Sequence, residues 1–118
     1  MRTIAVVTIL ALAVLPAAAQ TVVPIQVSPA VIVLGAPVAW VTVHADIPYG
    51  SVSTASIELN GLAVSWTKAD SRGDLVAKFD FDDVTASITT PSVTFTLTGL
   101  TKTGDAFEGS ATVRVRQR

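Results

Sequence analysis

Cysteine is absent from this sequence of 118 residues, histidine occurs once, and charged residues make up only 14% of the chain. Without cysteine no disulfide can form, so a folded domain must be stabilised by its apolar core alone. A transition-metal site is not expected, because such sites are built from several histidines and cysteines. The formal net charge is −1 and its charges are scattered, which argues against nucleic-acid binding, since that needs a clustered basic face.

The first 19 residues have the features of a signal peptide. Arg2 supplies a short positive start, residues 4–15 are largely apolar, and residues 17–19 are the small alanines that a signal peptidase needs. The apolar run is about 12 residues long, whereas a membrane-spanning helix needs about 20. We therefore predict cleavage after Ala19 and no membrane insertion of the mature chain, with a retained N-terminal anchor as the alternative. No cysteine follows, so lipoprotein attachment is excluded.

Residues 20–118 are rich in valine and threonine and alternate apolar with polar positions, without sustained helical periodicity. This pattern is typical of β-strands. In residues 75–81, for example, Leu75, Ala77, Phe79 and Phe81 occupy every second position and are expected to face a core. About seven such runs separated by turn signals predict one all-β domain, an antiparallel β-sandwich of seven to eight strands over residues 20–118.

Local signals predict two turns and the environment of one tryptophan. Asn60-Gly61 favours a tight hairpin, because both residues accept positive φ. Residues 82–88 break the alternation and are expected to form a short helical turn. Trp66 shares its strand parity with Leu62 and Val64, which predicts that it lies in the core.

Trp40 is the main candidate for a binding surface. It shares a strand face with Thr42 and His44, opposite an apolar face. An exposed aromatic side chain can stack on a sugar ring or anchor a protein partner. Tyr49, in the loop that follows, is a second candidate. The alternative is that a loop or the proline-rich first strand covers Trp40.

Three segments carry a resemblance to a known family. Residues 56–61 read SIELNG, residues 74–80 read DLVAKFD, and residues 93–99 read VTFTLTG. Together these segments resemble the immunoglobulin-like domain of secreted bacterial and archaeal surface proteins, which often accompanies dockerin modules. The resemblance covers roughly residues 38–115 and implies an immunoglobulin-like sandwich. The same family commonly carries an aspartate-rich calcium loop before the second segment, and Asp70 and Asp74 match its first and last acidic positions.

The segment Asp70-Ser71-Arg72-Gly73-Asp74 leaves three interpretations open. The first is a polar turn with Gly73 at positive φ. The second is a weak calcium site, although calcium takes six to eight oxygen ligands and the middle aspartates of the family's loop are missing here. The third is an adhesion tripeptide, Arg72-Gly73-Asp74, exposed on a loop.

Two further groups of residues are candidates for catalysis. Asp80, Asp82 and Asp83 form the densest carboxylate cluster, but acids on one exposed strand face usually keep an edge soluble. His44 and Asp46 could be combined with Ser51 or Ser53, yet no Gly-x-Ser-x-Gly elbow is present. We therefore expect a protein that is not an enzyme and has no cofactor.

The features together predict a secreted module, extracellular or periplasmic, with a structural or adhesive role at the cell envelope or exterior. Its expected partners are proteins or polysaccharides of the cell surface, or other copies of the same chain. The alternative function is a carbohydrate-binding module that uses the face of Trp40.

Overall fold

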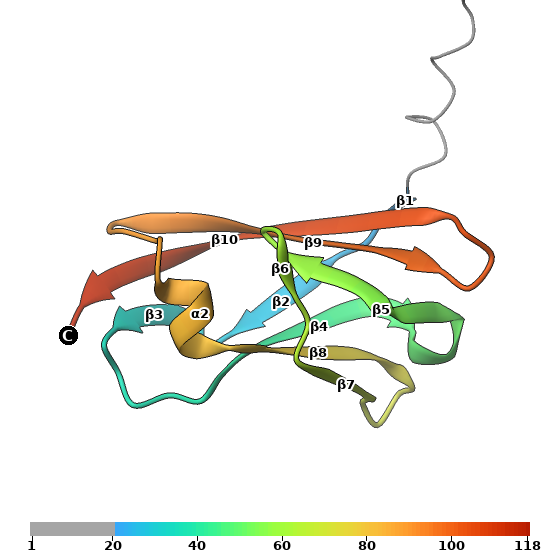
Figure 1. Cartoon of the computed structure of the whole chain (residues 1–118), viewed down its shortest axis with the longest axis horizontal. Helices are drawn as coiled ribbons and strands as arrows, with labels where there is room; N and C mark the ends of the chain where they lie inside the picture. Colours follow the sequence, from blue (N-terminus) through green and yellow to red (C-terminus); the bar gives the residue numbers. More distant parts are fainter. Residues whose placement is uncertain (1–20) are drawn as a thin grey trace, which may run out of the picture.

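The computed structural model describes residues 21–118, most of which lie in strands. The predicted signal peptide, residues 1–19, lies outside the described residues. Two sheets pack against each other, with a short helix at one end (Figure 1). The predicted all-β sandwich is therefore confirmed.

The first sheet contains six strands in the order β1-β10-β9-β5-β6, with β3 as a second neighbour of β10. The second sheet contains four strands in the order β2-β4-β8-β7. The strands of the first sheet are β1 (Thr21–Val22), β3 (Val31–Leu34), β5 (Val52–Leu59), β6 (Leu62–Ala63), β9 (Ser92–Thr101) and β10 (Ala106–Gln117). The strands of the second sheet are β2 (Ile25–Ser28), β4 (Trp40–Pro48), β7 (Trp66–Ala69) and β8 (Asp74–Asp80).

This strand order is that of an immunoglobulin-like sandwich, in which A-B-E-D form one sheet and G-F-C, extended by C′, form the other. Strands β4, β8 and β7 take the B, E and D positions, and β10, β9, β5 and β6 take the G, F, C and C′ positions. The first strand position is divided among β1, β2 and β3, which alternate between the sheets. Together with the other seven it makes eight positions, within the predicted seven to eight.

The core lies between the sheets and consists of the inward-facing positions of the alternating strands. Leu75, Ala77, Phe79 and Phe81 are each at most 1% exposed, as the alternation predicted. Burying a leucine or phenylalanine side chain contributes roughly 1.5–3 kcal/mol. No polar or charged residue of the described chain is buried, so apolar contact holds the sheets together.

The N-terminal segment crosses from the first sheet to the second over Gly109 of β10. The backbone N–H of Val23 donates to the carbonyl oxygen of Glu108 at 2.7 Å, and β2 then begins in the other sheet at Ile25. A Cβ on Gly109 would collide with the carbonyl oxygen of Val23 and with the side chain of Ile25. Glycine therefore permits the close approach that this crossing requires.

The predicted turns are present. Asn60 and Gly61, between β5 and β6, have φ values of 49° and 86°, as an Asn-Gly hairpin requires. Helix α2 (Phe81–Thr85) begins one residue before the segment expected to be helical, and a short 3-10 helix η2 (Tyr49–Ser51) follows β4. None of the helices within residues 21–118 has the length and apolar character needed to cross a membrane.

Candidate functional site

Both tryptophans lie on the outward face of the second sheet. Side chains alternate along a strand, so Trp40 on β4 points away from the core that its neighbour Val41 enters. On the adjacent strand β8, Asp80 is the register partner of Trp40, and Lys78 is the register partner of Trp66 on β7. The two tryptophans therefore flank β8 on the same side of the sheet.

The two indole rings contact each other edge to face. Their centroids are 6.2 Å apart and their planes make an angle of 84°, which is a favourable arrangement for aromatic pairs. Trp66 is 42% exposed, and Trp40 is half-buried. The pair restrains both rings and presents aromatic surface to solvent.

The prediction that Trp66 lies in the core is wrong, because the chain changes sheets just before it. The backbone N–H of Val64 still donates to Ile57 of the first sheet at 3.1 Å, whereas the N–H of Ser65 donates to Lys78 of the second sheet at 2.9 Å. The parity that Trp66 shares with Leu62 therefore does not continue across this step. One signal was available in the sequence: Trp66 shares its parity with Lys68, and an unpaired lysine is rarely buried.

Two lysines approach the ring of Trp66. The Nζ atom of Lys78 lies 5.5 Å from the ring centroid and that of Lys68 lies 5.9 Å from it, both within the range of a cation–π interaction. Val76, which also faces outward on β8, is only 1% exposed, so the side chains around it form a closed cover. We call Trp40, Trp66, Lys68 and Lys78 the aromatic patch.

The loop that joins β7 to β8 is a turn closed by its own first residue. The Oδ1 atom of Asp70 accepts hydrogen bonds from the backbone N–H groups of Arg72 at 2.8 Å and Asp74 at 2.9 Å. Gly73 has a φ of 86°, as expected for the polar turn. The hydrogen bond from the backbone N–H of Asp74 is the largest of the effects that lower the pKa of the Asp70 carboxyl below its ordinary value.

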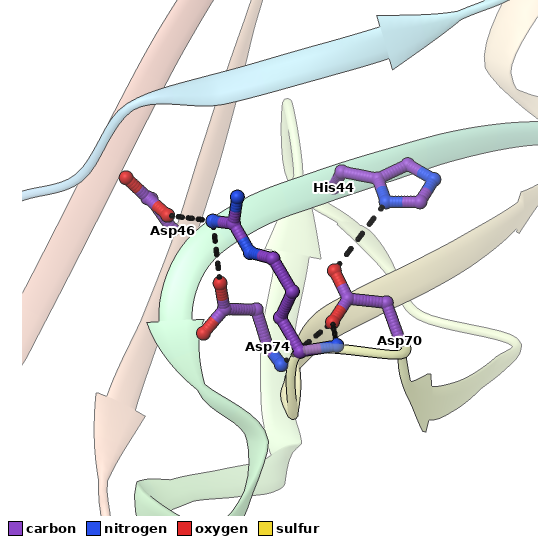
Figure 2. A network of polar contacts seen from close by, with 5 residues as sticks. His44, Asp46, Asp70 and Asp74 are labelled. Atoms are coloured by element: carbon purple, nitrogen blue, oxygen red, sulfur yellow. Dashed lines mark hydrogen bonds and ion pairs between the residues drawn. The ribbon is translucent and has the colours of Figure 1, made fainter.

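The guanidinium of Arg72 joins two carboxylates. One nitrogen, Nη2, lies 3.2 Å from Oδ1 of Asp46 and 3.2 Å from Oδ2 of Asp74 (Figure 2). The hydrogen bond to Asp74 is the main reason why the pKa of Arg72 is raised. The charged ends of the Arg72-Gly73-Asp74 tripeptide are therefore bonded to each other, and we call this network the Asp70–Asp74 loop.

The densest carboxylate cluster of the sequence, Asp80, Asp82 and Asp83, lies too far from this loop to complete a calcium site there. Asp74 begins β8 and Asp80 ends it, so at about 3.3 Å per residue they are separated by roughly 20 Å. Asp80 instead caps helix α2, accepting a hydrogen bond from the N–H of Asp83 at 3.0 Å. Within the described chain, no group of three or more histidines or acidic residues is arranged to hold a metal ion.

The candidate catalytic residues do not come together in the fold. The Nδ1 atom of His44 lies 4.0 Å from Oδ2 of Asp70 (Figure 2), on the side of the loop network and not against a serine. The hydroxyl of Ser51 donates to the carbonyl oxygen of Pro48 at 2.8 Å. A depression of about 390 Å³ lies beside these groups and is lined by His44, Asp46, Asp70 and Arg72 among others. Of these side chains, Arg72 is already bonded to Asp46, and His44 lies beside Asp70.

Tyr49 is not brought to Trp40. It follows the C-terminal end of β4, whereas Trp40 begins that strand, and it is partly buried against the core. Its hydroxyl lies 3.4 Å from Oγ1 of Thr67. The two candidates for a binding surface therefore lie at opposite ends of β4.

Comparisons of this chain with protein-family models, with curated proteins and with solved structures find no match. The resemblance to the immunoglobulin-like domain of surface proteins stays a prediction, while the immunoglobulin-like topology follows from the strand order itself.

Proposed function

We propose that the mature chain is a secreted, non-enzymatic recognition module that binds polysaccharide at the cell envelope or outside the cell. The observation that supports this best is the edge-to-face pair of Trp40 and Trp66 on the outer face of the second sheet. A restrained aromatic surface offers an apolar face for the C–H groups of sugar rings and loses little conformational freedom on binding. The sandwich supplies the rigid support beneath it.

The test is retention of the chain from residue 20 onward on a panel of immobilised polysaccharides and envelope fractions. We expect Trp66→Ala and Trp40→Ala each to weaken retention at least about tenfold, the effect of losing a binding hot spot. Leu100→Ala is the matched control, because Leu100 is 43% exposed on the first sheet, much like Trp66. Unchanged retention of both tryptophan variants would reject the patch as the contact surface.

A structural or adhesive role through self-association is the second candidate. Strand β6 has only two residues and pairs with only the end of β5, at Glu58 and Leu59. The rest of that edge, residues 52–56, has no strand partner on this side within the described chain, and a free edge can pair with another chain. Concentration-dependent dimerisation in sedimentation experiments, together with no retention on any polysaccharide, would favour this role.

A further inference from the structure

The lysines beside Trp66 form no ion pair within the part of the chain that the structure describes. Within residues 21–118, every ion pair involves either Arg72 or His44. Lys68 and Lys78 instead lie against the indole ring. Two ammonium groups are thus held about an aromatic surface without a carboxylate partner.

The carboxylates on this face lie at its two ends: Asp80 lies beside Trp40, and Asp46, Asp70 and Asp74 lie around the Asp70–Asp74 loop, where Arg72 and backbone N–H groups bind them. Asp80 is the only carboxylate that the registers of β4, β7 and β8 place in the rows of Trp40, Trp66 and Lys78, and it caps helix α2. His44 and Lys68 lie on either side of Val76 in the next row. The four residues of the patch itself therefore carry two positive charges and no negative one, although the whole chain has a net charge of −1.

From this charge we propose that the aromatic patch binds a carboxylated polysaccharide, one built from uronic acid residues, with its sugar rings on Trp40 and Trp66 and its carboxylates against Lys68 and Lys78. This inference rests on the proposed function. Charge complementarity selects an anionic partner. Both cations are lysines, which act as compact point charges and can each meet one carboxylate of such a chain.

The contacts of the two lysines with the indole ring lower the entropy cost of binding a carboxylate. An ammonium group held near an indole has already lost part of its freedom, so less is lost when it meets a carboxylate. Because Lys68 and Trp66 are two residues apart on β7, and Lys78 faces Trp66 from β8, the two charges approach the ring from different strands. A chain of charged sugars passing over the ring can therefore meet both.

The test compares polygalacturonate with its methyl ester, which keeps the sugar backbone and removes the charge, and with dextran sulfate and a neutral glucan. Affinity of the chain from residue 20 onward would be measured by calorimetry at low and high salt. We expect polygalacturonate to bind at least about tenfold more tightly than its ester, with affinity that falls as salt rises. The Lys68→Gln, Lys78→Gln double variant should abolish this difference, and Lys102→Gln, on a turn of the first sheet, should not.

Each other outcome overturns the inference in a distinct way. Equal binding of acid and ester, still lost with Trp66→Ala, would reject the charge preference and leave the proposed function standing. Equally tight, lysine-dependent binding of dextran sulfate would reject carboxylate as the recognised group. Binding to none of the four polymers would reject the inference and weigh against the proposed function as well.

Discussion

The Asp70–Asp74 loop joins β7 to β8, and the aromatic patch lies on these two strands and on β4, yet the charged groups of the two regions differ in their partners. In the loop, Arg72 is bonded to Asp46 and Asp74, and the carboxylate of Asp70 accepts two backbone hydrogen bonds. In the patch, Lys68 and Lys78 lie against the ring of Trp66 and form no ion pair within residues 21–118.

The difference shows which candidate has capacity left for a ligand. A partner that bound the loop would first have to break hydrogen bonds and ion pairs that already exist, so little net free energy would be gained. A partner that bound the patch would cover exposed aromatic surface and supply the missing negative charge. A dense group of charges in the sequence is therefore a weaker sign of binding than an aromatic residue beside unpaired cations.

The largest effect should come from the face of β8 that belongs to neither site. Phe79, whose sequence neighbours Lys78 and Asp80 face outward, is itself fully buried. Phe79→Ala therefore removes a large core side chain. We expect a loss of about 3–5 kcal/mol in the free energy of unfolding, measured by chemical denaturation. Both regions should lose their structure together, because both depend on this strand.

Lys78→Gln is the matched control on the neighbouring position. Its side chain faces outward, so we expect a change within about 0.5 kcal/mol, as for ordinary surface substitutions. A loss as large as that of Phe79→Ala would mean that the patch is part of the structural core. The patch would then have a structural role, as the loop has, and the contrast between the two regions would not hold.

Strand alternation predicted the inner face of the sandwich well, since burial acts directly on every second residue. The buried positions of residues 75–81 and the positive φ values at Asn60 and Gly61 follow from local chemistry alone. The same local rule failed where the chain changes sheets. Trp66 was misplaced because parity does not continue through Val64 and Ser65, which bond to different sheets.

The candidate site was predicted only in part for a related reason. Trp40 was identified from its own strand, but its contact with Trp66 depends on which strands flank β8. That neighbourhood is a property of topology, which a single strand pattern does not contain. The pairing of Arg72 with Asp46, 26 residues away in sequence, could not be predicted either, because it also depends on which strands are neighbours.

A smaller effect should appear when the charge of Asp70 is removed. Asp70→Asn keeps an oxygen that can accept the two backbone hydrogen bonds and loses only the negative charge. The pKa of this carboxyl is lowered in the folded chain, so its charge stabilises the fold above the ordinary value of 3.8 and ceases to do so as the pH falls through the lowered value. We expect a higher Tm for the wild type at neutral pH, and a difference that shrinks as the pH falls below 3.8 and disappears once it is below the lowered pKa.

The control for this pH series is Asp82→Asn on helix α2, because the Asp82 carboxylate accepts no hydrogen bond within the part of the chain that the structure describes. The Tm of Asp82→Asn should differ little from that of the wild type, both at neutral pH and at low pH. If the difference in Tm between the wild type and Asp70→Asn persisted or grew in acid, the charge of Asp70 would not be the group that stabilises the loop.

The smallest effect should be that of calcium. The carboxylates of the loop already hold Arg72 and two backbone N–H groups, and calcium takes six to eight oxygen ligands. We expect calcium at about 10 mM, above the dissociation constants of weak extracellular modules, to shift the Tm no further than EDTA does. A bound ion at a hundred times its Kd would add about 2.7 kcal/mol to the stability, which raises the Tm of a domain of this size by roughly 10 °C or more. If calcium stabilised Arg72→Ala and not the wild type, the guanidinium would be the group that keeps the ion out. If calcium stabilised the wild type, the loop would retain a ligand site, and its contrast with the aromatic patch would not hold.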